Sequence, residues 1–173
     1  LHSITGSKNL CMGGGVALNC VANYKILQQT PFERIYIHPA AGDDGTGARA
    51  ASYVLHNRLD VPRHGEVAHA CWGTGYSDEE CEKAASASGL PFRKLSRDQL
   101  LATAADALAR GSTIGWFQGR EEWGPRALGN RSILCNPGWP DMKAILNARV
   151  KNREPFRPFA PAILHERLSE CFE

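Results

Sequence analysis

The sequence predicts an α/β fold, and its first 60 residues carry the clearest pattern. Two short apolar runs have the length and composition of buried strands, and a glycine-rich turn and a helical pattern follow each of them. The runs are 9–12 and 34–38, and the helices expected after them are 16–27 and 48–57. A strand, a glycine turn and a helix, repeated twice, are typical of a mostly parallel sheet covered by helices.

The later elements follow from capping residues and apolar periodicity. Ser77, with Glu80 three residues later, is a capping box, so a helix is expected from there to Gly89. A second helix is expected after Ser96, with an apolar stripe that ends at Gly111. The other predicted elements are strands 92–95, 113–118 and 131–135, a short helical turn at 125–129, and a helix over 141–150 with Met142, Ile145, Leu146 and Val150 facing inward.

Length and composition indicate a globular protein of one or two domains. The chain has 173 residues, of which 43% are hydrophobic, and this share fits a real core. Residues 60–70 contain a proline, a glycine and mixed charge without periodicity, so they are predicted to link residues 1–59 to residues 71–173. The net charge of +2 argues against a strongly basic nucleic-acid-binding surface.

The six cysteines have no Cys-x-x-Cys pair, which argues against a zinc ribbon. We interpret them as buried free thiols, since a disulfide framework is unusual in a chain of this size without a secretion signal. No apolar run is long enough to span a bilayer, and we expect no membrane partner and a cytoplasmic location. The chain begins at Leu1, so we expect it to be a processed or excised piece.

Two arginine-rich segments carry the strongest functional signal. The first is Glu122-Trp123-Gly124-Pro125-Arg126-Ala127-Leu128-Gly129-Asn130-Arg131-Ser132, and the second, at 150–161, contains Lys151, Arg153 and Arg157. Guanidinium groups on stiff, glycine-spaced turns suit the oxygens of phosphate or carboxylate. We interpret both segments as one site for an anionic small molecule. Lys143, Asn147 and Lys151 are spaced by four and are expected to share a polar helix stripe, with Lys143 on a solvated face.

Two other segments allow both a functional and a structural interpretation. Gly13-Gly14-Gly15 before a helix can turn backbone N–H groups toward a phosphate, or can serve tight packing of strand and helix. Asp43 and Asp44 follow a strand, where paired carboxylates suit a hard cation or the metal of a nucleotide. The same pair can equally cap the next helix.

Four motifs in one order resemble the NodU/CmcH-type carbamoyltransferases, which tailor nodulation factors and antibiotics. They are Gly14-Gly15-Val16-Ala17-Leu18-Asn19, Pro39-Ala40-Ala41-Gly42-Asp43-Asp44-Gly45, the 124–132 run, and the 151–161 run. The resemblance covers nearly the whole chain. It implies that residues 1–59 are the end of an ASKHA-type (actin/sugar-kinase-like) transferase domain and that residues 71–173 begin a YrdC-like α/β domain.

The resemblance also implies a reaction. In this family, carbamoyl phosphate and ATP with Mg²⁺ give carbamoyl adenylate, whose carbamoyl group passes to a small-molecule hydroxyl on a glycoside, an antibiotic or a lipo-oligosaccharide. Fixed positive charge offsets the repulsion between the two anions and stabilises the leaving pyrophosphate. The implied catalytic residues are Arg126, Arg131, Lys151 and Arg153, and the implied binding residues are Gly14, Gly15, Asn19, Asn130, Ser132, Asn147 and Arg157. Asp44, with Asp43 as the fallback, aligns with a ligand of an iron or zinc-like metal.

The sequence departs from the family pattern at the metal site. The family binds its metal through a His-x-x-x-His pair, and no two histidines here are four apart. We therefore expect an internal fragment with an incomplete metal site, whose open sheet edge favours self-association into a homo-oligomer. Two alternatives stay open, namely a YrdC-like RNA-binding or tRNA-modification module and an inactive truncated remnant. Steep salt dependence would mark RNA binding, and the modest net charge argues against it.

Overall fold

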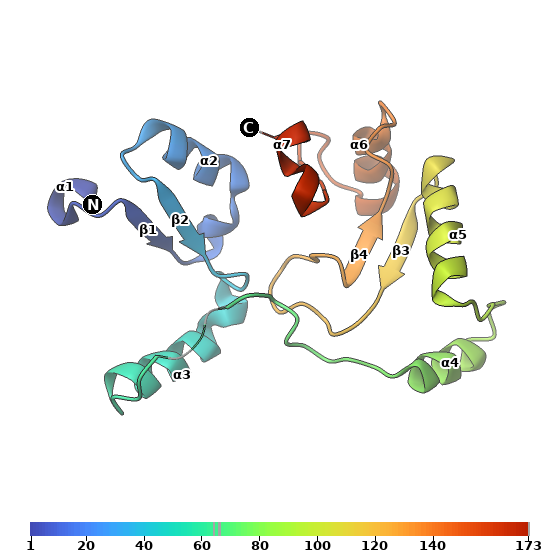
Figure 1. Cartoon of the computed structure of the whole chain (residues 1–173), viewed down its shortest axis with the longest axis horizontal. Coiled ribbons are helices and arrows are strands. Elements are labelled where there is room, and N and C mark those ends of the chain that lie inside the picture. Colours follow the sequence, from blue (N-terminus) through green and yellow to red (C-terminus); the bar gives the residue numbers. More distant parts are fainter. Residues whose placement is uncertain (64, 66, 173) are drawn as a thin grey trace. The chain divides into compact units, whose positions relative to one another are not determined.

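A computed structural model describes residues 1–63, 65 and 67–172 of the chain (Figure 1). It contains two compact units: Leu1–Pro91 with Trp116–Ser132, and Phe92–Gly115 with Ile133–Glu173. We call them unit 1 and unit 2. The predicted linker at 60–70 stays a prediction, and its residues 64 and 66 lie outside the described residues.

Unit 1 begins with the predicted parallel strand pair. Its first elements are α1 (His2–Thr5), β1 (Asn9–Met12), η1 (Gly15–Leu18), α2 (Cys20–Gln29) and β2 (Arg34–Ile37). β1 and β2 are parallel, with Asn9 opposite Arg34 and Met12 opposite Ile37. Figure 1 shows the chain passing from β1 through α2 into β2. Parallel neighbouring strands need such a crossover connection, usually through a helix. The β–α–β prediction is therefore confirmed.

The helix predicted over 16–27 is divided into two. η1 is a short 3₁₀ helix, and Asn19 separates it from α2 with an extended backbone (φ −84°, ψ 93°). The Asn19 side chain accepts a hydrogen bond from the N–H of Ala22, at 3.1 Å. Asn19 is thus the N-cap of α2, because a side-chain oxygen there satisfies one of the free N–H groups of the first turn.

A tight turn leads from β2 into the next helix. The turn is η2 (Asp43–Gly45), and α3 (Thr46–Asn57) begins two residues earlier than predicted. The guanidinium of Arg49, on α3, donates to the carbonyl oxygens of Ala41 and Gly42. These bonds fix the turn against its own helix, and the arginine that makes them was not singled out from the sequence.

The two capped helices form where the sequence places them. α4 (Asp78–Ala87) in unit 1 has the predicted capping box between Ser77 and Glu80. α5 (Arg97–Ala109) in unit 2 has a second capping box between Ser96 and Gln99. The strand predicted at 92–95 does not form, since no neighbouring segment among the described residues pairs with it.

The strands predicted near 113–118 and 131–135 are β3 (Ile114–Phe117) and β4 (Arg131–Leu134), which together form a separate two-stranded sheet. The described residues thus contain two small sheets, of which the first, β1 and β2, is the parallel sheet predicted for the start of the chain. The boundary between the two units falls within both strands.

The rest of unit 2 is helical, and its main helix changes type midway. α6 (Met142–Ile145) continues as the π-helix η3 (Leu146–Lys151), and η4 (His165–Arg167) and α7 (Leu168–Cys171) follow. Met142 and Leu146 are buried as predicted, whereas Val150 is 39% exposed. The wider π turn breaks the 3.6-residue period on which the inward placement of Val150 rested.

The core within the described residues is small, which corrects the expectation from composition. Its buried apolar side chains are Ala17, Ala40, Ala41, Ala70, Met142 and Leu146. Leu100 and Leu101 on the predicted apolar stripe of α5 are 45% and 46% exposed. All six cysteines are free, as predicted, but none of them is buried, so the prediction that these thiols are buried is wrong. No described helix has the length and apolar character that a membrane span requires.

Candidate functional site

Three of the four sequence motifs meet in unit 1. The N–H of Gly14 donates to the carbonyl of Ala41 at 2.8 Å, which joins the glycine turn to the turn after β2. From the other side, the indole Nε1 of Trp123 donates to the carbonyl of Asp44 at 3.2 Å. Ala40 and Ala41, in the middle, are completely buried. Segments about 80 residues apart in the sequence are therefore packed on one turn.

Gly124 shows how closely these segments approach. Its φ is +129°, and a Cβ added there would lie 2.6 Å from the carbonyl oxygen of Pro39. Only glycine allows both this backbone conformation and this contact. The glycine before Pro125 is thus required by packing.

Aromatic rings and backbone bonds hold the start of the arginine loop. The Trp123 ring stacks on Trp72, with centroids 5.6 Å apart, and meets His38 edge-on at 5.1 Å. The N–H of Trp123 donates to the carbonyl of Ala70, at 2.7 Å, and the N–H of Gly73 donates to the carbonyl of Glu121, at 2.9 Å. These contacts, together with the turn after β2, fix residues 121–124.

Glu122 closes the loop from inside. Its side chain is buried, and Oε1 accepts hydrogen bonds from the N–H groups of Leu128, at 2.7 Å, and Asn130, at 2.6 Å. Burial alone raises the pKa of this carboxyl, but the backbone N–H groups, led by those of Asn130 and Leu128, outweigh it and hold the pKa below its ordinary value. The helical turn predicted at 125–129 does not form, because the loop is organised around this carboxylate instead.

The two arginines of the loop differ in their surroundings. Arg126 is exposed and has no hydrogen bond or ion pair with the part of the chain that the structure describes. The Arg131 guanidinium lies over the ring of Phe117, 3.6 Å from its centroid. It donates to four backbone carbonyls, those of Gln118, Asn130, Gly119 and Thr74, at 2.8 to 3.3 Å. Arg131 therefore joins backbone segments, and Arg126 is the guanidinium open to a ligand.

Asn130 and Ser132 also make internal bonds. Asn130 Nδ2 donates to the carbonyl of Arg120, at 2.6 Å, and to Sγ of Cys71, at 3.2 Å. The hydroxyl of Ser132 accepts from the N–H of Gly129, at 2.9 Å. Both side chains stabilise the loop conformation.

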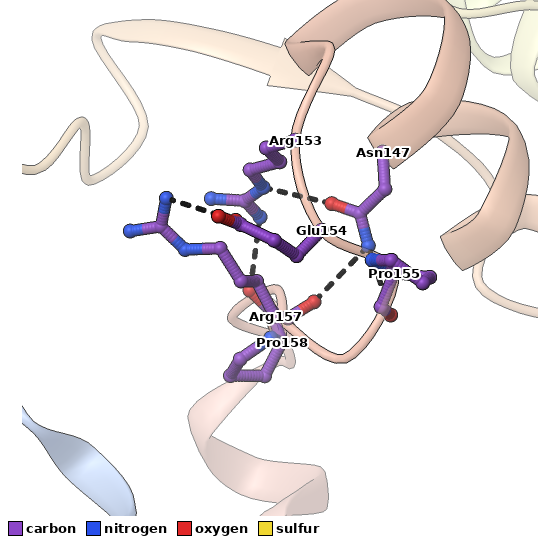
Figure 2. Close-up of polar contacts among 6 residues, drawn as sticks. All are labelled: Asn147, Arg153, Glu154, Pro155, Arg157 and Pro158. Atoms are coloured by element: carbon purple, nitrogen blue, oxygen red, sulfur yellow. Dashed lines mark hydrogen bonds and ion pairs between the residues drawn. The ribbon is translucent and has the colours of Figure 1, made fainter.

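The second basic segment is organised by a buried asparagine in unit 2 (Figure 2). Asn147 is 1% exposed, and its Nδ2 donates to the carbonyls of Pro155 and Arg157 at 3.3 and 3.2 Å. Its Oδ1 accepts from Nε of Arg153 at 2.7 Å. The polar stripe predicted for Lys143, Asn147 and Lys151 is thus wrong: the asparagine faces inward, and both lysines are exposed.

The cations of this segment divide in the same way as those of the loop. Arg153 lies over the ring of Phe159, 4.6 Å from its centroid, and its Nη2 donates to the carbonyl of Pro158. Arg157 is exposed and pairs with Glu154 at 3.8 Å, as Figure 2 shows. Lys151 has no partner within the described residues. Each of the two basic segments thus contains an arginine bound to carbonyls and a cation exposed to solvent.

Comparison with known proteins identifies the family. Residues 1–52 match the model for the carbamoyltransferase N-terminus, and residues 105–173 match the model for the carbamoyltransferase C-terminus. The chain belongs to the carbamoyltransferase family. Both arginine-rich segments lie in the C-terminal match, and the glycine turn and the Asp43-Asp44 turn lie in the N-terminal match.

Curated relatives agree with this membership. The chain is 43% identical over 173 residues to nodulation protein NolO of Bradyrhizobium diazoefficiens, covering 98% of this chain and 31% of that protein. It is 44% identical over 176 residues to nodulation protein NolNO of Sinorhizobium fredii, and the match covers 99% of this chain and 26% of that protein. Nodulation protein U of Rhizobium tropici is 34% identical to the chain over 173 residues, and the match covers 99% of this chain and 28% of that protein. The chain spans less than a third of the length of each of these relatives.

Within this chain, the nucleotide contacts that the resemblance implies have structural roles of their own. The N–H of Gly14 is bonded to Ala41, and the Asn19 oxygen caps α2. The Gly14 N–H is therefore not open to a phosphate. The interpretation of this turn as a packing device is supported at Gly14.

The metal ligands do not form a complete set here. Asp43 and Asp44 are exposed in η2, and no side-chain cap bond is made at the start of α3. The described residues contain no group of three or more His, Cys, Asp or Glu side chains that could hold a metal ion. Two carboxylates do not provide the ligand number that a firmly bound transition metal needs, so this part of the chain does not fit the metal.

Three residues that organise the site were not assigned roles from the sequence: Arg49, Glu122 and Trp123. A carboxylate two residues before a Gly-Pro turn is a signal that could have identified Glu122, since such turns leave N–H groups in need of acceptors. The roles of Arg49 and Trp123 depend on contacts that no local pattern shows.

Proposed function

We propose that this chain supplies anion-binding elements of an O-carbamoyltransferase that uses carbamoyl phosphate and ATP. The observation that carries the proposal is Arg126, an exposed guanidinium without a partner among the described residues, on a loop that is fixed by internal bonds. A guanidinium held by a stiff loop binds phosphate oxygens without first losing its own partners. The family membership supports the choice of reaction.

The reaction needs positive charge at two stages. Hydrolysis of carbamoyl phosphate by one water releases phosphate and leaves carbamate, whose oxygen displaces pyrophosphate from ATP to give carbamoyl adenylate. The carbamoyl group then passes to a hydroxyl oxygen, which loses its proton, and AMP leaves. Each stage brings anions together or creates a new one, and fixed cations stabilise that charge. We assign direct anion contacts to Arg126 in unit 1 and Lys151 in unit 2, and a supporting role to Arg131 and Arg153, whose donors are bound to carbonyls.

The remaining assignments follow from the resemblance. Mg²⁺ would accompany the ATP phosphates, and the acceptor would be a hydroxyl of a glycoside, an antibiotic or a lipo-oligosaccharide. The names of the relatives as nodulation proteins favour the last class. Residues 1–59 would end an ASKHA-type domain, and residues 71–173 would begin a YrdC-like domain. No step is assigned to the iron or zinc-like metal, since the described residues do not hold it.

Titration calorimetry with ATP and with carbamoyl phosphate tests the proposal. Arg126→Ala should weaken binding about tenfold or more, because hydrogen bonds to charged groups contribute about 1.5–3 kcal/mol. Lys25→Ala is the matched control, since Lys25 is an exposed cation on α2 without a partner in the described chain. The control should bind as the wild type does. Equal affinity of Arg126→Ala and wild type would overturn the proposal.

A further inference from the structure

Glu122 is a buried, ionised carboxylate to which neither the resemblance nor the comparisons give a role. The residue is 9% exposed, and its carboxylate accepts hydrogen bonds from the backbone N–H groups of Leu128 and Asn130. A buried charge is costly unless it is fully hydrogen-bonded, so a carboxylate retained there meets a local demand for acceptors. That demand comes from the loop at 123–131.

The loop has the composition of a phosphate-binding turn, but its N–H groups are already occupied. Glycine-rich turns bind phosphate when consecutive N–H groups converge on an empty space. Here the N–H groups of Leu128 and Asn130 donate to Glu122, and the N–H of Gly129, between them, donates to the hydroxyl of Ser132. Three successive amides are satisfied within the protein.

Two consequences follow from this internal capping. A phosphate oxygen finds neither a free donor nor a favourable charge at these amides, because a fixed carboxylate is already there. The loop also has a defined conformation before any ligand arrives, although Arg126 and Leu128 are exposed at its surface. The only open cationic donor that the loop offers is therefore the side chain of Arg126.

We propose that Glu122 is a positioning residue, which takes the place of a phosphate in the backbone cradle at 128–130 and thereby fixes Arg126 as the anion contact of the loop. The proposal rests on the function proposed above. It adds that the anion is recognised by a side chain on a preorganised loop, and that the backbone amides of the loop do not bind it. Preorganisation of this kind raises affinity because less conformational freedom is lost on binding.

The test uses Glu122→Gln in the whole chain, with Glu121→Gln as the matched control. The two substitutions are chemically identical and adjacent, but Glu121 is exposed. Glutamine at 122 keeps the volume and removes the charge that holds two amides. Affinity for ATP and for inorganic pyrophosphate would be measured by calorimetry. Hydrogen exchange of individual amides would be followed by NMR on the same samples.

We expect Glu122→Gln to weaken binding about tenfold, because a neutral amide oxygen holds the two N–H groups less firmly than a carboxylate oxygen does. Exchange at Leu128 and Asn130 should accelerate by a similar factor, while the amide of Ile35 in β2 keeps its rate. Uniform acceleration at all three amides would show a merely structural role and would overturn the proposal. The control should match the wild type in both assays.

The binding results separate this proposal from the proposed function. Full binding by Arg126→Ala contradicts the proposed function. Loss of binding in Arg126→Ala together with full binding in Glu122→Gln overturns only the role of Glu122. If Glu122→Gln does not fold, hydrogen exchange in the wild type tests the proposal instead. The wild-type amides of Leu128 and Asn130 should exchange about a hundredfold more slowly than in an unfolded chain. Unprotected exchange at both would overturn the proposal.

Discussion

Replacement of Gly124 by alanine tests whether the arginine loop is packed on the turn after β2. Ordinary contacts of a Cβ atom begin near 3.4 Å, and the added Cβ would lie 2.6 Å from the carbonyl oxygen of Pro39, so one backbone would have to move by nearly an ångström. Backbone atoms cannot rotate away as a flexible side chain can. Gly124→Ala should therefore separate the loop from the turn.

Gly129→Ala separates this clash from backbone strain. Gly129 lies in the same loop at φ +122°, close to the +129° of Gly124, but no atom lies within 4 Å of its added Cβ. Strain at such φ values costs about 1–3 kcal/mol in both variants. The overlap should add about 1–3 kcal/mol to Gly124→Ala alone, as overpacking does in protein interiors. The difference between the two variants thus measures the contact with Pro39.

Urea unfolding followed by the fluorescence of Trp123 is a suitable assay, since this ring stacks on Trp72 and contacts the turn directly. The other tryptophans except Trp72 would be replaced by phenylalanine in every sample, so that the signal reports on unit 1. We expect Gly124→Ala to unfold at a lower urea concentration than Gly129→Ala. If the two variants have equal midpoints and slopes, the close packing of loop and turn is refuted.

Three further results are expected. Arg131→Lys keeps the charge but loses the planar guanidinium that reaches four carbonyls. It should lower the free energy of unfolding, measured by urea titration, by about 1–2 kcal/mol. An unchanged urea midpoint would contradict the role of Arg131 in holding these backbone segments together. Asn147→Ala leaves two carbonyls without their donor and should cost about 2–4 kcal/mol in unit 2. Asn136→Ala is the comparison, since Asn136 is only half-buried and its side-chain oxygen accepts a single bond, from the N–H of Gly138. The pKa of Glu122, which burial raises but backbone N–H bonds lower further, lies below its ordinary value near 4.5, so its stabilisation is present above that pH and is lost as the pH falls through the folded pKa. The stability difference between wild type and Glu122→Gln should therefore shrink as the pH falls below about 4.5, and a constant difference would argue against ionisation of this carboxyl.

Elements whose signals are local could be predicted well from the sequence. The strands at 9–12 and 34–38, the helix after Ser77 and the helix after Ser96 all form, because capping bonds and glycine turns act within a few residues. Errors arose where the period changes or a partner is needed. The π turn at 146–151 altered the faces of its helix, and residues 92–95 have no strand beside them.

Burial was predicted less well, for a different physical reason. Amphipathic spacing tells which face of a helix could be covered, but a neighbouring element must do the covering. Leu100 and Leu101 lie on the predicted stripe and are nearly half exposed, whereas Ala40 and Ala41, which carry no periodic signal, are completely buried. Covering contacts are long-range, and a single sequence does not contain them.

The sequence alone therefore determined the motifs, the family resemblance and the abundance of cations at two segments. Tertiary structure decided which cations are available. Arg126 and Arg131 are five residues apart and chemically identical, yet one is open to solvent and the other donates to four carbonyls. The difference arises because a guanidinium bonds to whatever oxygens the fold brings within reach, and those oxygens belong to residues 74, 118, 119 and 130, which only the folded chain brings together.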